Sequence, residues 1–302
     1  MDLKSKIILI YGPTACGKSK FAIKLAKKIS GQIINADSMQ VYKDLKILTA
    51  RPFSKDCQKI KHHLYGFQSA NKNFSTGDWL KLVNQKILHC KKIKKIPILV
   101  GGTGLYFKAL TNGLVSIPKI PLSFRYKVRN LHKKIGQKKF FLELLKLDPL
   151  IRNRLNNSDV QRSIRAYEIK SFTKKSMISW FKNTKPEHDQ SDFFKICIDF
   201  PRKDLIEIIN NRSREMIKSG AILEVKRFIN LKVPMNKSLS KAIGISEIKQ
   251  YLEKKIQTEQ LIEKISIKTR QYAKRQSTWA RGNMKDWIKI KPDGLSKLLK
   301  KI

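Results

Sequence analysis

The sequence predicts an α/β fold, in which a parallel sheet is covered by helices. Short apolar runs alternate with helical patterns, and this alternation is typical of strands joined by crossover helices. A long stretch without strand signal interrupts the alternation after Pro118. We therefore expect a helical insertion domain over residues 118–189, within a core formed by residues 1–117 and 190–302. The expected strands are Ile7–Ile10, Gln32–Asn35, Pro97–Val100 and Phe193–Asp199.

A glycine-rich loop follows the first strand and precedes a helical pattern that is predicted to end at Gly31. Its sequence is Gly12-Pro13-Thr14-Ala15-Cys16-Gly17-Lys18-Ser19. A strand, this spacing and a helix are the context of a phosphate-binding loop, whose N–H groups converge at the positive end of the helix dipole. We predict a P-loop NTPase-like sheet in which the loop binds a polyphosphate, Lys18 reaches its outer phosphate and Ser19 ligates Mg²⁺. Cys16 is interpreted as structural.

Composition favours a polyanionic partner. The 302 residues include 65 Lys plus Arg and 23 Asp plus Glu, for a formal net charge of +42. Nucleic acid is the partner that such a charge favours, although a lysine excess spread over a solvated surface is the alternative. Hydrophobic residues make up 41%, which excludes a disordered basic chain. The four cysteines are scattered, so the sequence predicts neither a zinc site nor a disulfide framework.

No apolar run has the length of a membrane span, and the first one passes directly into the glycine-rich loop. Scattered free cysteines are typical of a reducing compartment. We therefore expect a cytoplasmic protein that does not contact membranes, and a monomer.

Polar residues follow the second and third strands, where an open α/β sheet places its ligand crevice. Asp37 lies two residues past the end of the second strand. Its carboxylate could ligate Mg²⁺, act as a general base or cap the next turn, and position alone favours the cap. The run Gly101-Gly102-Thr103-Gly104 follows the third strand, so we expect close approach of a ligand to the backbone there, with Thr103 offering a hydroxyl. The pair His62-His63 resembles metal ligands, but adjacent side chains diverge and a structural role is favoured.

The remaining elements are expected to be mainly helical. Inside the insertion we predict helices over Phe124–Ile135 and Lys138–Leu147, one opened by Asp148-Pro149, and one capped by Asp159. After the last strand, Asp204 is predicted to cap a helix that runs to Gly220 and carries Arg212 beside its apolar stripe. Residues 258–281 form the final predicted helix. Its last turns mix cations with aromatic residues, which suits RNA phosphates and a stacked base, with compensation of the helix dipole as the alternative.

Together these motifs resemble the tRNA dimethylallyltransferase family, the bacterial adenosine isopentenyltransferases. The resemblance covers nearly the whole chain, and the segments around Asp37 and near the C-terminus are more specific than the phosphate-binding loop alone. In chain order, the matching segments are Gly12–Ser19, Asp37–Lys43, Thr49–Pro52, His62–Leu64, Gly101–Tyr106, Asp159–Arg162, Arg165–Glu168, Met216–Gly220, and Ala273–Gln276 with Thr278 and Trp279.

The resemblance implies a reaction and a role for several residues. Enzymes of this family transfer a dimethylallyl group from dimethylallyl pyrophosphate to N6 of the adenine 3′ to the anticodon, in tRNAs that read codons beginning with U. By this resemblance the loop and Arg212 hold the pyrophosphate, Asp37 is the catalytic base and Thr103 orients the reactants. The anticodon stem-loop would contact Asp37, Ser38, Met39, Gln40, Thr103, Arg125, Gln161, Arg162, Ser163, Ile164, Arg165, Lys241, Gly244, Ser246, Lys274, Arg275, Gln276, Thr278, Trp279 and Arg281.

The chain departs from the family pattern at a few positions. The family usually carries Gly-Tyr followed by Lys or Arg where this chain has Gly244-Ile245-Ser246, and it commonly has Arg in place of Ile208. These departures remove expected tRNA contacts. Two other readings stay open: a nucleoside or small-molecule kinase that binds ATP on the same loop, and an RNA-binding module whose loop only senses a nucleotide.

Overall fold

The structure is a computed structural model that describes residues 3, 5–57, 59–182 and 184–302. The chain divides into two compact units. The core unit contains residues 1–111 and 188–302, and the insertion unit contains residues 112–187. The insertion unit begins six residues before the predicted boundary and ends two residues before it. No helix in the described ranges is both long and apolar enough to cross a bilayer.

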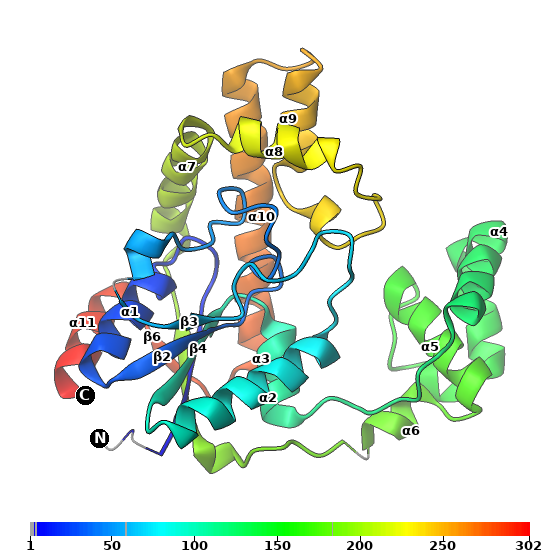
Figure 1. Ribbon diagram of the computed structural model, residues 1–302. Coiled ribbons are helices and arrows are strands. Elements are labelled where there is room, and N and C mark those ends of the chain that lie inside the picture. The colour runs from blue at the N-terminus through cyan, green and yellow to red at the C-terminus, as the bar shows by residue number, and fades with distance from the viewer. Residues whose placement is uncertain (1–2, 4, 58, 183) are drawn as a thin grey trace. The chain divides into compact units, whose positions relative to one another are not determined.

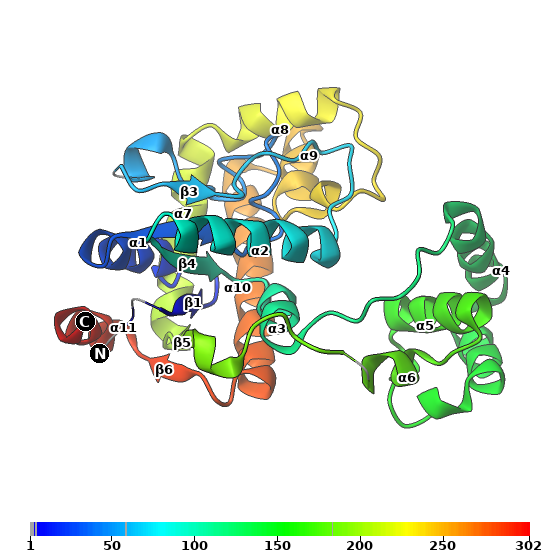
Figure 2. The ribbon, with the colours of Figure 1, turned by 60° about the horizontal axis from the view of Figure 1, so that its bottom comes forward.

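The core unit contains a six-stranded sheet in which every paired strand is parallel to its neighbour. Its order is β3-β2-β4-β1-β5-β6. Figure 2 shows β3 at the top, followed downward by β4, β1, β5 and β6. The predicted parallel α/β sheet is therefore confirmed, and the loops after the strands meet at one edge. The strands are β1 (Ile7–Tyr11), β2 (Gly31–Asn35), β3 (His62–His63), β4 (Ile96–Gly101), β5 (Phe193–Ile198) and β6 (Ile288–Ile290).

Both faces of the sheet are buried, which explains why β1 is apolar at every position. Ile8 and Ile10 face a cluster that includes α1 (Lys18–Lys28) and the start of α7 (Arg202–Lys218), with α11 (Pro292–Lys301) packed against it. Ile7, Leu9 and Tyr11 face the opposite cluster, formed with α2 (Thr76–Lys92), α3 (Gly104–Asn112) and the end of α10 (Thr258–Asn283).

A second layer of helices packs on the segment that follows β2. Figure 1 shows α7, α8 (Ala221–Asn230), α9 (Ile245–Leu252) and the first turns of α10 gathered at the top of the core unit. Glu224 of α8 ties this layer to the segment. Its carboxylate accepts hydrogen bonds from the backbone N–H groups of Lys46, Ile47 and Leu48 at 2.6, 2.9 and 2.9 Å. The chain beyond Asp37 is therefore anchored by a charge-assisted contact.

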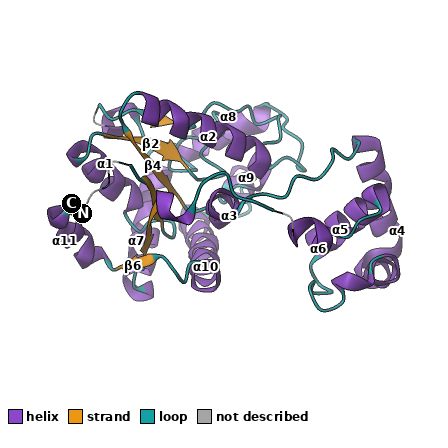
Figure 3. Cartoon of the chain, turned by 90° about the horizontal axis from the view of Figure 1, so that it is seen from below, coloured by secondary structure: helices purple, strands orange, loops and turns teal. Residues whose placement is uncertain are grey.

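The insertion unit consists of α4 (Leu122–Leu147), α5 (Val160–Thr173), α6 (Met177–Lys182) and their loops, and its described residues include no strand (Figure 3). Gly136 breaks α4 with a φ of 72°, so the two predicted helices around it are confirmed as two segments. The predicted cap at Asp159 is also present, since its side chain accepts from the Arg162 N–H at 3.0 Å. Residues from α4 and α5 form the small core together with Ile120, Ile151 and Met177.

Three predictions of local structure are wrong. Gly31 begins β2 instead of ending α1, because Ser30 takes the left-handed conformation at φ 53°. Asp148-Pro149 opens only a single 3₁₀ turn, Pro149–Ile151, in which the Asp148 side chain makes no capping hydrogen bond. Asp204 lies inside the first turn of α7, whose N-cap is Pro201; its charge still favours that end of the helix dipole.

Candidate active site

The glycine-rich loop joins β1 to α1 as predicted. Gly17 is the N-cap of α1 and has a φ of 81°, a conformation that favours glycine. Lys18 folds back, and its Nζ donates to the Pro13 carbonyl at 3.1 Å. Cys16 is buried, and a Cβ placed on Gly12 would lie 2.6 Å from the Cys16 Sγ. Burial raises the pKa of the Cys16 thiol, which supports the structural interpretation of this residue.

Gln276 of α10 ties this loop to the second glycine-rich loop. Its Oε1 accepts from the Thr14 N–H at 2.8 Å, and its Nε2 donates to the Gly102 carbonyl at 2.8 Å. The Tyr11 hydroxyl donates to the Gln276 backbone carbonyl at 2.9 Å. Only 5% of Gln276 is exposed. Although Gln276 was predicted to contact tRNA, its amide is occupied by these protein contacts.

The glycines after β4 allow other segments of the protein to pack closely against the backbone. A Cβ on Gly101 would lie 1.9 Å from the Ala36 carbonyl oxygen, one on Gly102 2.1 Å from the Gln276 Nε2, and one on Gly104 2.3 Å from the Trp279 ring. We predicted that these glycines allow a ligand to approach the backbone. In the structure their space is taken by the segment after β2 and by α10, so they bring the site's loops together.

Asp37 is oriented by its backbone and by its neighbours. The Asn35 Oδ1 accepts from the Asp37 N–H at 2.9 Å, and the Asn35 Nδ2 donates to the Asp37 carbonyl at 3.0 Å. The Oδ1 of Asp37 accepts from the Met39 N–H at 2.9 Å, so the predicted turn-capping role is present. Thr103 Oγ1 accepts from the Ser38 N–H at 2.9 Å. The Asp37 Oδ2 accepts no hydrogen bond from the described residues, so it remains available to a ligand.

Arg212 reaches the glycine-rich loop from α7. Its Nη1 donates to the Thr14 Oγ1 at 3.1 Å. Burial lowers the pKa of the Arg212 guanidinium, and the charge of Asp37 raises it. Arginine keeps its proton in spite of such a shift. The guanidinium forms no ion pair with a carboxylate of the described chain, so it is a partly desolvated cation beside a loop suited to phosphate.

Asp37, Thr14 and Arg212 line one cavity of about 330 Å³ in the core unit. Tyr272 also lines it, and burial raises the pKa of its phenol, which therefore stays a neutral hydrogen-bonding group. The cavity combines a carboxylate, a cation and an apolar wall. The apolar side chains in the wall are Met39, Leu48, Ile209, Met216, Ala242, Ile243 and Ile265.

The two adjacent histidines take part in protein contacts. The His63 Nε2 lies 2.7 Å from the Gln32 Oε1, and the His62 Nδ1 lies 2.8 Å from the Ile60 carbonyl oxygen. Burial lowers the pKa of His63 to about 4. No group of three or more His, Cys, Asp or Glu side chains in the described ranges is arranged to hold a metal ion.

The predicted tRNA contacts fall into three classes of exposure. Three of these residues, Ser163, Gly244 and Gln276, are buried. Half-buried are Asp37, Ser38, Met39, Gln40, Thr103, Arg125, Ile164, Arg165 and Trp279. Exposed are Gln161, Arg162, Lys241, Ser246, Lys274, Arg275, Thr278 and Arg281. Arg125 and Gln161–Arg165 belong to the insertion unit, and the others belong to the core unit.

Glu168 of the insertion unit ends the matching segment Arg165–Glu168, but no role was predicted for it. Its side chain is 1% exposed, and three arginines surround it. Its Oε2 lies 3.2 Å from both the Arg125 Nε and the Arg165 Nη1, and its Oε1 lies 3.7 Å from the Arg129 Nε. The arginines are 35–47% exposed. One buried carboxylate therefore orients three guanidinium groups that still reach solvent.

Asn35 was also missed as a site residue. The signal that could have identified it is its position at the end of a buried strand, two residues before Asp37, where Asn side chains often bond to the following backbone. For Glu168 and for the clamp made by Gln276 we find no comparable local signal.

Comparison with known proteins agrees with the geometry. Residues 40–283 match the family model described as IPP transferase. The tRNA dimethylallyltransferase of Pelagibacter ubique is 60% identical over 100% of this chain and 97% of its own length. That of Allorhizobium ampelinum is 42% identical over 97% of each chain.

Two solved structures have the same fold. The full-length tRNA isopentenylpyrophosphate transferase of Bacillus halodurans aligns with a TM-score of 0.70 at 27% identity, over 98% of this chain and 95% of that one. A eukaryotic dimethylallyltransferase described as acting on tRNA aligns with a TM-score of 0.84 at 28% identity, over 95% of this chain and 73% of that one. The family model and the full-length identity confirm the resemblance that the motifs indicated, and the chain belongs to the IPP transferase family.

Proposed function

We propose that the core unit transfers a dimethylallyl group from dimethylallyl pyrophosphate to N6 of the adenine 3′ to the anticodon, in tRNAs that read codons beginning with U. The observation that carries this proposal is the shared cavity of Asp37 and Arg212 beside the phosphate-binding loop. The free carboxylate oxygen of Asp37 suits an amine that loses a proton. The desolvated cation of Arg212 suits a pyrophosphate, and the apolar wall suits a prenyl group. The products are N6-(dimethylallyl)adenosine and pyrophosphate.

In this reaction the N6 amine attacks C1 of the dimethylallyl group while the bond from C1 to the pyrophosphate oxygen breaks. The N6 nitrogen loses a proton, which the free Oδ2 of Asp37 accepts as general base. We assign Asp37 this role because its Oδ1 is already held by the Met39 N–H. Thr103 contributes by holding Ser38, which fixes the turn that carries Asp37.

The leaving pyrophosphate gains negative charge as the bond breaks. Loop N–H groups, Lys18 and Arg212 are placed to stabilise that charge, and such preorganised donors are a large term in catalysis. Lys18 would exchange its contact with the Pro13 carbonyl for a phosphate oxygen.

The residues present fit a Mg²⁺ ion that binds together with the substrate. The Ser19 side chain is exposed and makes no hydrogen bond to described residues, and Mg²⁺ commonly uses few protein ligands together with waters and substrate phosphates. Bound there, Mg²⁺ would neutralise charge on the pyrophosphate. A nucleotide such as ATP would compete for the same loop.

The tRNA contacts in both units are part of this proposal. The exposed cations of α10 suit backbone phosphates, and the arginines around Glu168 would extend the contact onto the insertion unit. The target base must leave its stack to enter the cavity. The monomeric state and the cytoplasmic location stay predictions.

The test is incubation of the protein with isotope-labelled dimethylallyl pyrophosphate, Mg²⁺ and unmodified tRNA, followed by digestion and mass spectrometry of the nucleosides. Asp37→Asn keeps an oxygen for the Met39 N–H and removes the base. We expect turnover to fall about 10²–10⁴-fold with tRNA affinity preserved. Asp44→Asn is the matched control, because Asp44 accepts from the Ala70 N–H in the same region and does not line the cavity.

Two results would contradict the proposal. If the wild-type protein forms no prenylated adenosine on any tRNA but moves the γ-phosphate of ATP to a small molecule, the chain is a kinase. If Asp37→Asn turns over like Asp44→Asn, Asp37 is not the base.

A further inference from the structure

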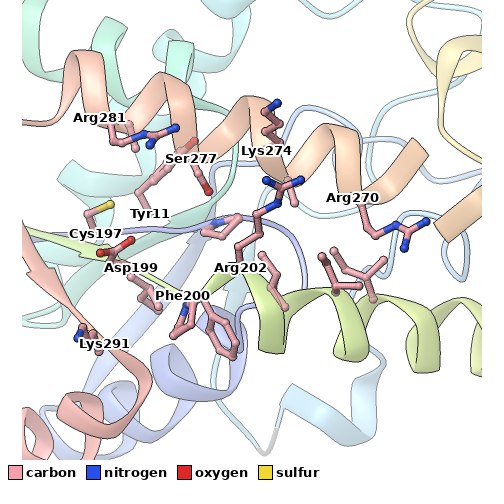
Figure 4. Close-up of a pocket in the computed structure, with 18 of the residues that line it drawn as sticks. Tyr11, Cys197, Asp199, Phe200, Arg202, Arg270, Lys274, Ser277, Arg281 and Lys291 are labelled. Atoms are coloured by element: carbon pink, nitrogen blue, oxygen red, sulfur yellow. The ribbon is translucent and has the colours of Figure 1, made fainter. Parts of the chain in front are cut away.

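A second cavity of the core unit, about 870 Å³ in volume, lies between α7 and α10 beside the carboxyl ends of β5 and β6 (Figure 4). Asp199 is the one carboxylate among the described residues that line it. Six basic residues, Arg202, Arg270, Lys274, Arg281, Lys289 and Lys291, line it as well, and we call them the basic cavity residues. Four of them, all except Lys274 and Arg281, belong to none of the sites described above.

The basic cavity residues are not neutralised by the protein. Among the residues that the structure describes, Arg202, Arg270, Lys289 and Lys291 have no ion pair and no side-chain hydrogen bond, and Arg281 bonds only to the Thr278 hydroxyl at 3.2 Å. Elsewhere in the core unit a lysine near the sheet is paired, as Lys195 is with Asp286. Like charges gathered in one hollow repel one another and create a positive potential that attracts polyanions.

This cavity is adjacent to the one that contains Asp37, and Ile209 lines both. The glycine-rich loop and α10 each contribute different residues to the two cavities. The phosphate-binding loop contributes Pro13 to the basic cavity and Thr14 to the other. The helix α10 contributes Lys274 and Ser277 here, and Tyr272 and Arg275 there. Along a helix, positions 270, 274, 277 and 281 share one face, so a ligand in the basic cavity would follow one stripe of α10.

The basic cavity residues belong to α7, α10, β6 and the residue after β6, and their charges lie at the ends of long side chains. Figure 4 shows Arg202 extending from the start of α7 toward α10, while Lys291 lies on the opposite side of the cavity beyond Phe200. All six except Arg270 are exposed. Such cations suit successive phosphates of a backbone, which proteins contact with exposed Lys and Arg. A small anion would instead need buried, convergent donors of the kind that Arg212 provides.

We propose that the basic cavity binds the sugar-phosphate backbone of the tRNA substrate and thereby extends the RNA contact from α10 onto α7 and β6. The ligand class is a single RNA strand, read through its phosphates and without base specificity. This inference rests on the proposed function for the identity of the RNA, but its test measures binding and does not require turnover.

The test compares two triple variants that each remove three positive charges. The cavity variant is Arg202→Gln, Lys289→Gln and Lys291→Gln. The matched control is Lys203→Gln, Lys285→Gln and Lys297→Gln, which are exposed residues of the core unit outside the cavity. The affinity for unmodified tRNA is measured over a series of salt concentrations, and the KM for dimethylallyl pyrophosphate is measured alongside.

We expect the cavity variant to bind tRNA about tenfold more weakly at low salt and to lower the slope of log affinity against log salt by about 2, because each phosphate contact contributes about 0.7 to that slope for single strands. In the control variant, the changes in tRNA affinity and in the salt slope should each be less than half of those in the cavity variant. The KM for dimethylallyl pyrophosphate should stay within about twofold of the wild-type value, since the pyrophosphate binds in the other cavity.

Equal losses in both triple variants would overturn the inference, because the net charge alone would then explain the affinity. A raised KM for dimethylallyl pyrophosphate with unchanged tRNA affinity would also overturn it and assign the cavity to a small anion. The comparison is repeated with the single variants Arg202→Glu and Lys203→Glu. It supports the inference only if Arg202→Glu weakens tRNA binding more than Lys203→Glu does. Prenyl transfer by the wild-type protein with unaltered tRNA binding by the cavity variant would reject this inference and leave the proposed function standing.

Discussion

The two units hold their arginines in opposite ways. In the core unit, Arg212 is partly desolvated, bonds to the Thr14 hydroxyl and has no carboxylate partner in the described residues. In the insertion unit, Glu168 is 1% exposed and orients three arginines that remain 35–47% exposed. The first arrangement leaves a desolvated cation that has no direct ion pair in the described residues, although the charge of Asp37 acts on it, and the second leaves a surplus of cations facing solvent.

The difference teaches what each unit is suited to bind. Desolvating an unpaired charge lowers stability unless a ligand supplies the opposite charge, so the environment of Arg212 favours a small anion that enters the cavity. A buried carboxylate that is outnumbered by arginines fixes their geometry while the local charge stays positive. That arrangement favours a large polyanion that never leaves the solvent.

The largest expected effect comes from Arg212→Met, which keeps the length of the side chain and removes its charge. We expect kcat/KM for dimethylallyl pyrophosphate to fall about 10²–10³-fold, the usual loss for one charge-stabilising donor. The thermal unfolding midpoint of the ligand-free protein should be equal to or above that of the wild type, because a desolvated charge has been removed. Steady-state kinetics and calorimetry measure the two quantities. A lower unfolding midpoint in the variant would show that the Arg212 charge stabilises the ligand-free protein, and the contrast between the two units would then be wrong.

The next effect tests the other arrangement. Glu168→Gln removes one negative charge and so raises the net charge of the protein by one, and simple electrostatics therefore predicts tighter binding of tRNA. We expect instead that tRNA affinity falls about fivefold to tenfold and that stability falls by about 1–3 kcal/mol, because the three arginines lose the group that orients them. Filter binding and chemical denaturation measure these changes.

Glu143→Gln is the control for that variant, since Glu143 is an exposed acid of the same unit whose one ion pair within the described part of the chain is with Lys146. It should leave tRNA affinity unchanged or slightly raised. If Glu168→Gln behaves in the same way, Glu168 does not position the arginines for binding.

A smaller effect is expected from the uncharged clamp of the core unit. Gln276→Leu leaves the Thr14 N–H and the Gly102 carbonyl without partners, at a cost of about 1–3 kcal/mol, and we expect turnover to fall about tenfold. Because no charge is lost, the ratio of variant to wild-type turnover should be the same at low and high salt, unlike the effect at Glu168. A ratio that depends strongly on salt would indicate that Gln276 contacts tRNA, as the sequence analysis predicted.

The smallest effect concerns His63, a basic side chain of the core unit that is buried with no carboxylate partner among the described residues. Burial, followed by the charges of Lys86 and His89, lowers its pKa to about 4 from an unfolded value of about 6.5. The unfolded chain therefore takes up a proton first as pH falls, so the stability that neutral His63 contributes is complete above pH 6.5 and is lost as pH falls toward 4.

We expect this loss to be about 1–3 kcal/mol, since one pKa unit corresponds to about 1.4 kcal/mol. Denaturant titrations at pH 7.5, 5.5 and 4.5 measure it. His63→Gln should lack this component of the pH dependence, and an identical pH profile in the variant would show that His63 is not its source. Unlike Arg212, His63 can shed its charge, which is why burial costs it less.

Much of the site was predictable because its signals are local. A buried apolar strand, a glycine spacing and a helical period predicted the phosphate-binding loop and placed Asp37 at the carboxyl edge of the sheet. The errors at Gly31, Asp148 and Asp204 are also local, and each arose where a neighbouring residue, Ser30 or Pro201, took over the predicted role or where a turn did not extend.

The roles that sequence reasoning missed depend on residues far apart in the chain. Gln276 bonds to Thr14 across 262 positions and to Gly102 across 174, and Glu168 receives Arg125 across 43. A glutamine such as Gln276 can equally bind RNA, and a glutamate such as Glu168 can equally be a solvated acid. Composition and spacing therefore do not distinguish the buried role of either residue from an exposed one.

The sequence by itself determined the parallel α/β sheet, the glycine-rich loop between β1 and α1, and the family, because hydrophobic period and motif spacing are properties of short segments. Only the tertiary structure decided which cations remain unpaired, that Gln276 clamps the loops, and that a basic cavity opens on the far face of α10. Those outcomes depend on burial and on the distances between side chains from separate elements, and both exist only once the elements have packed.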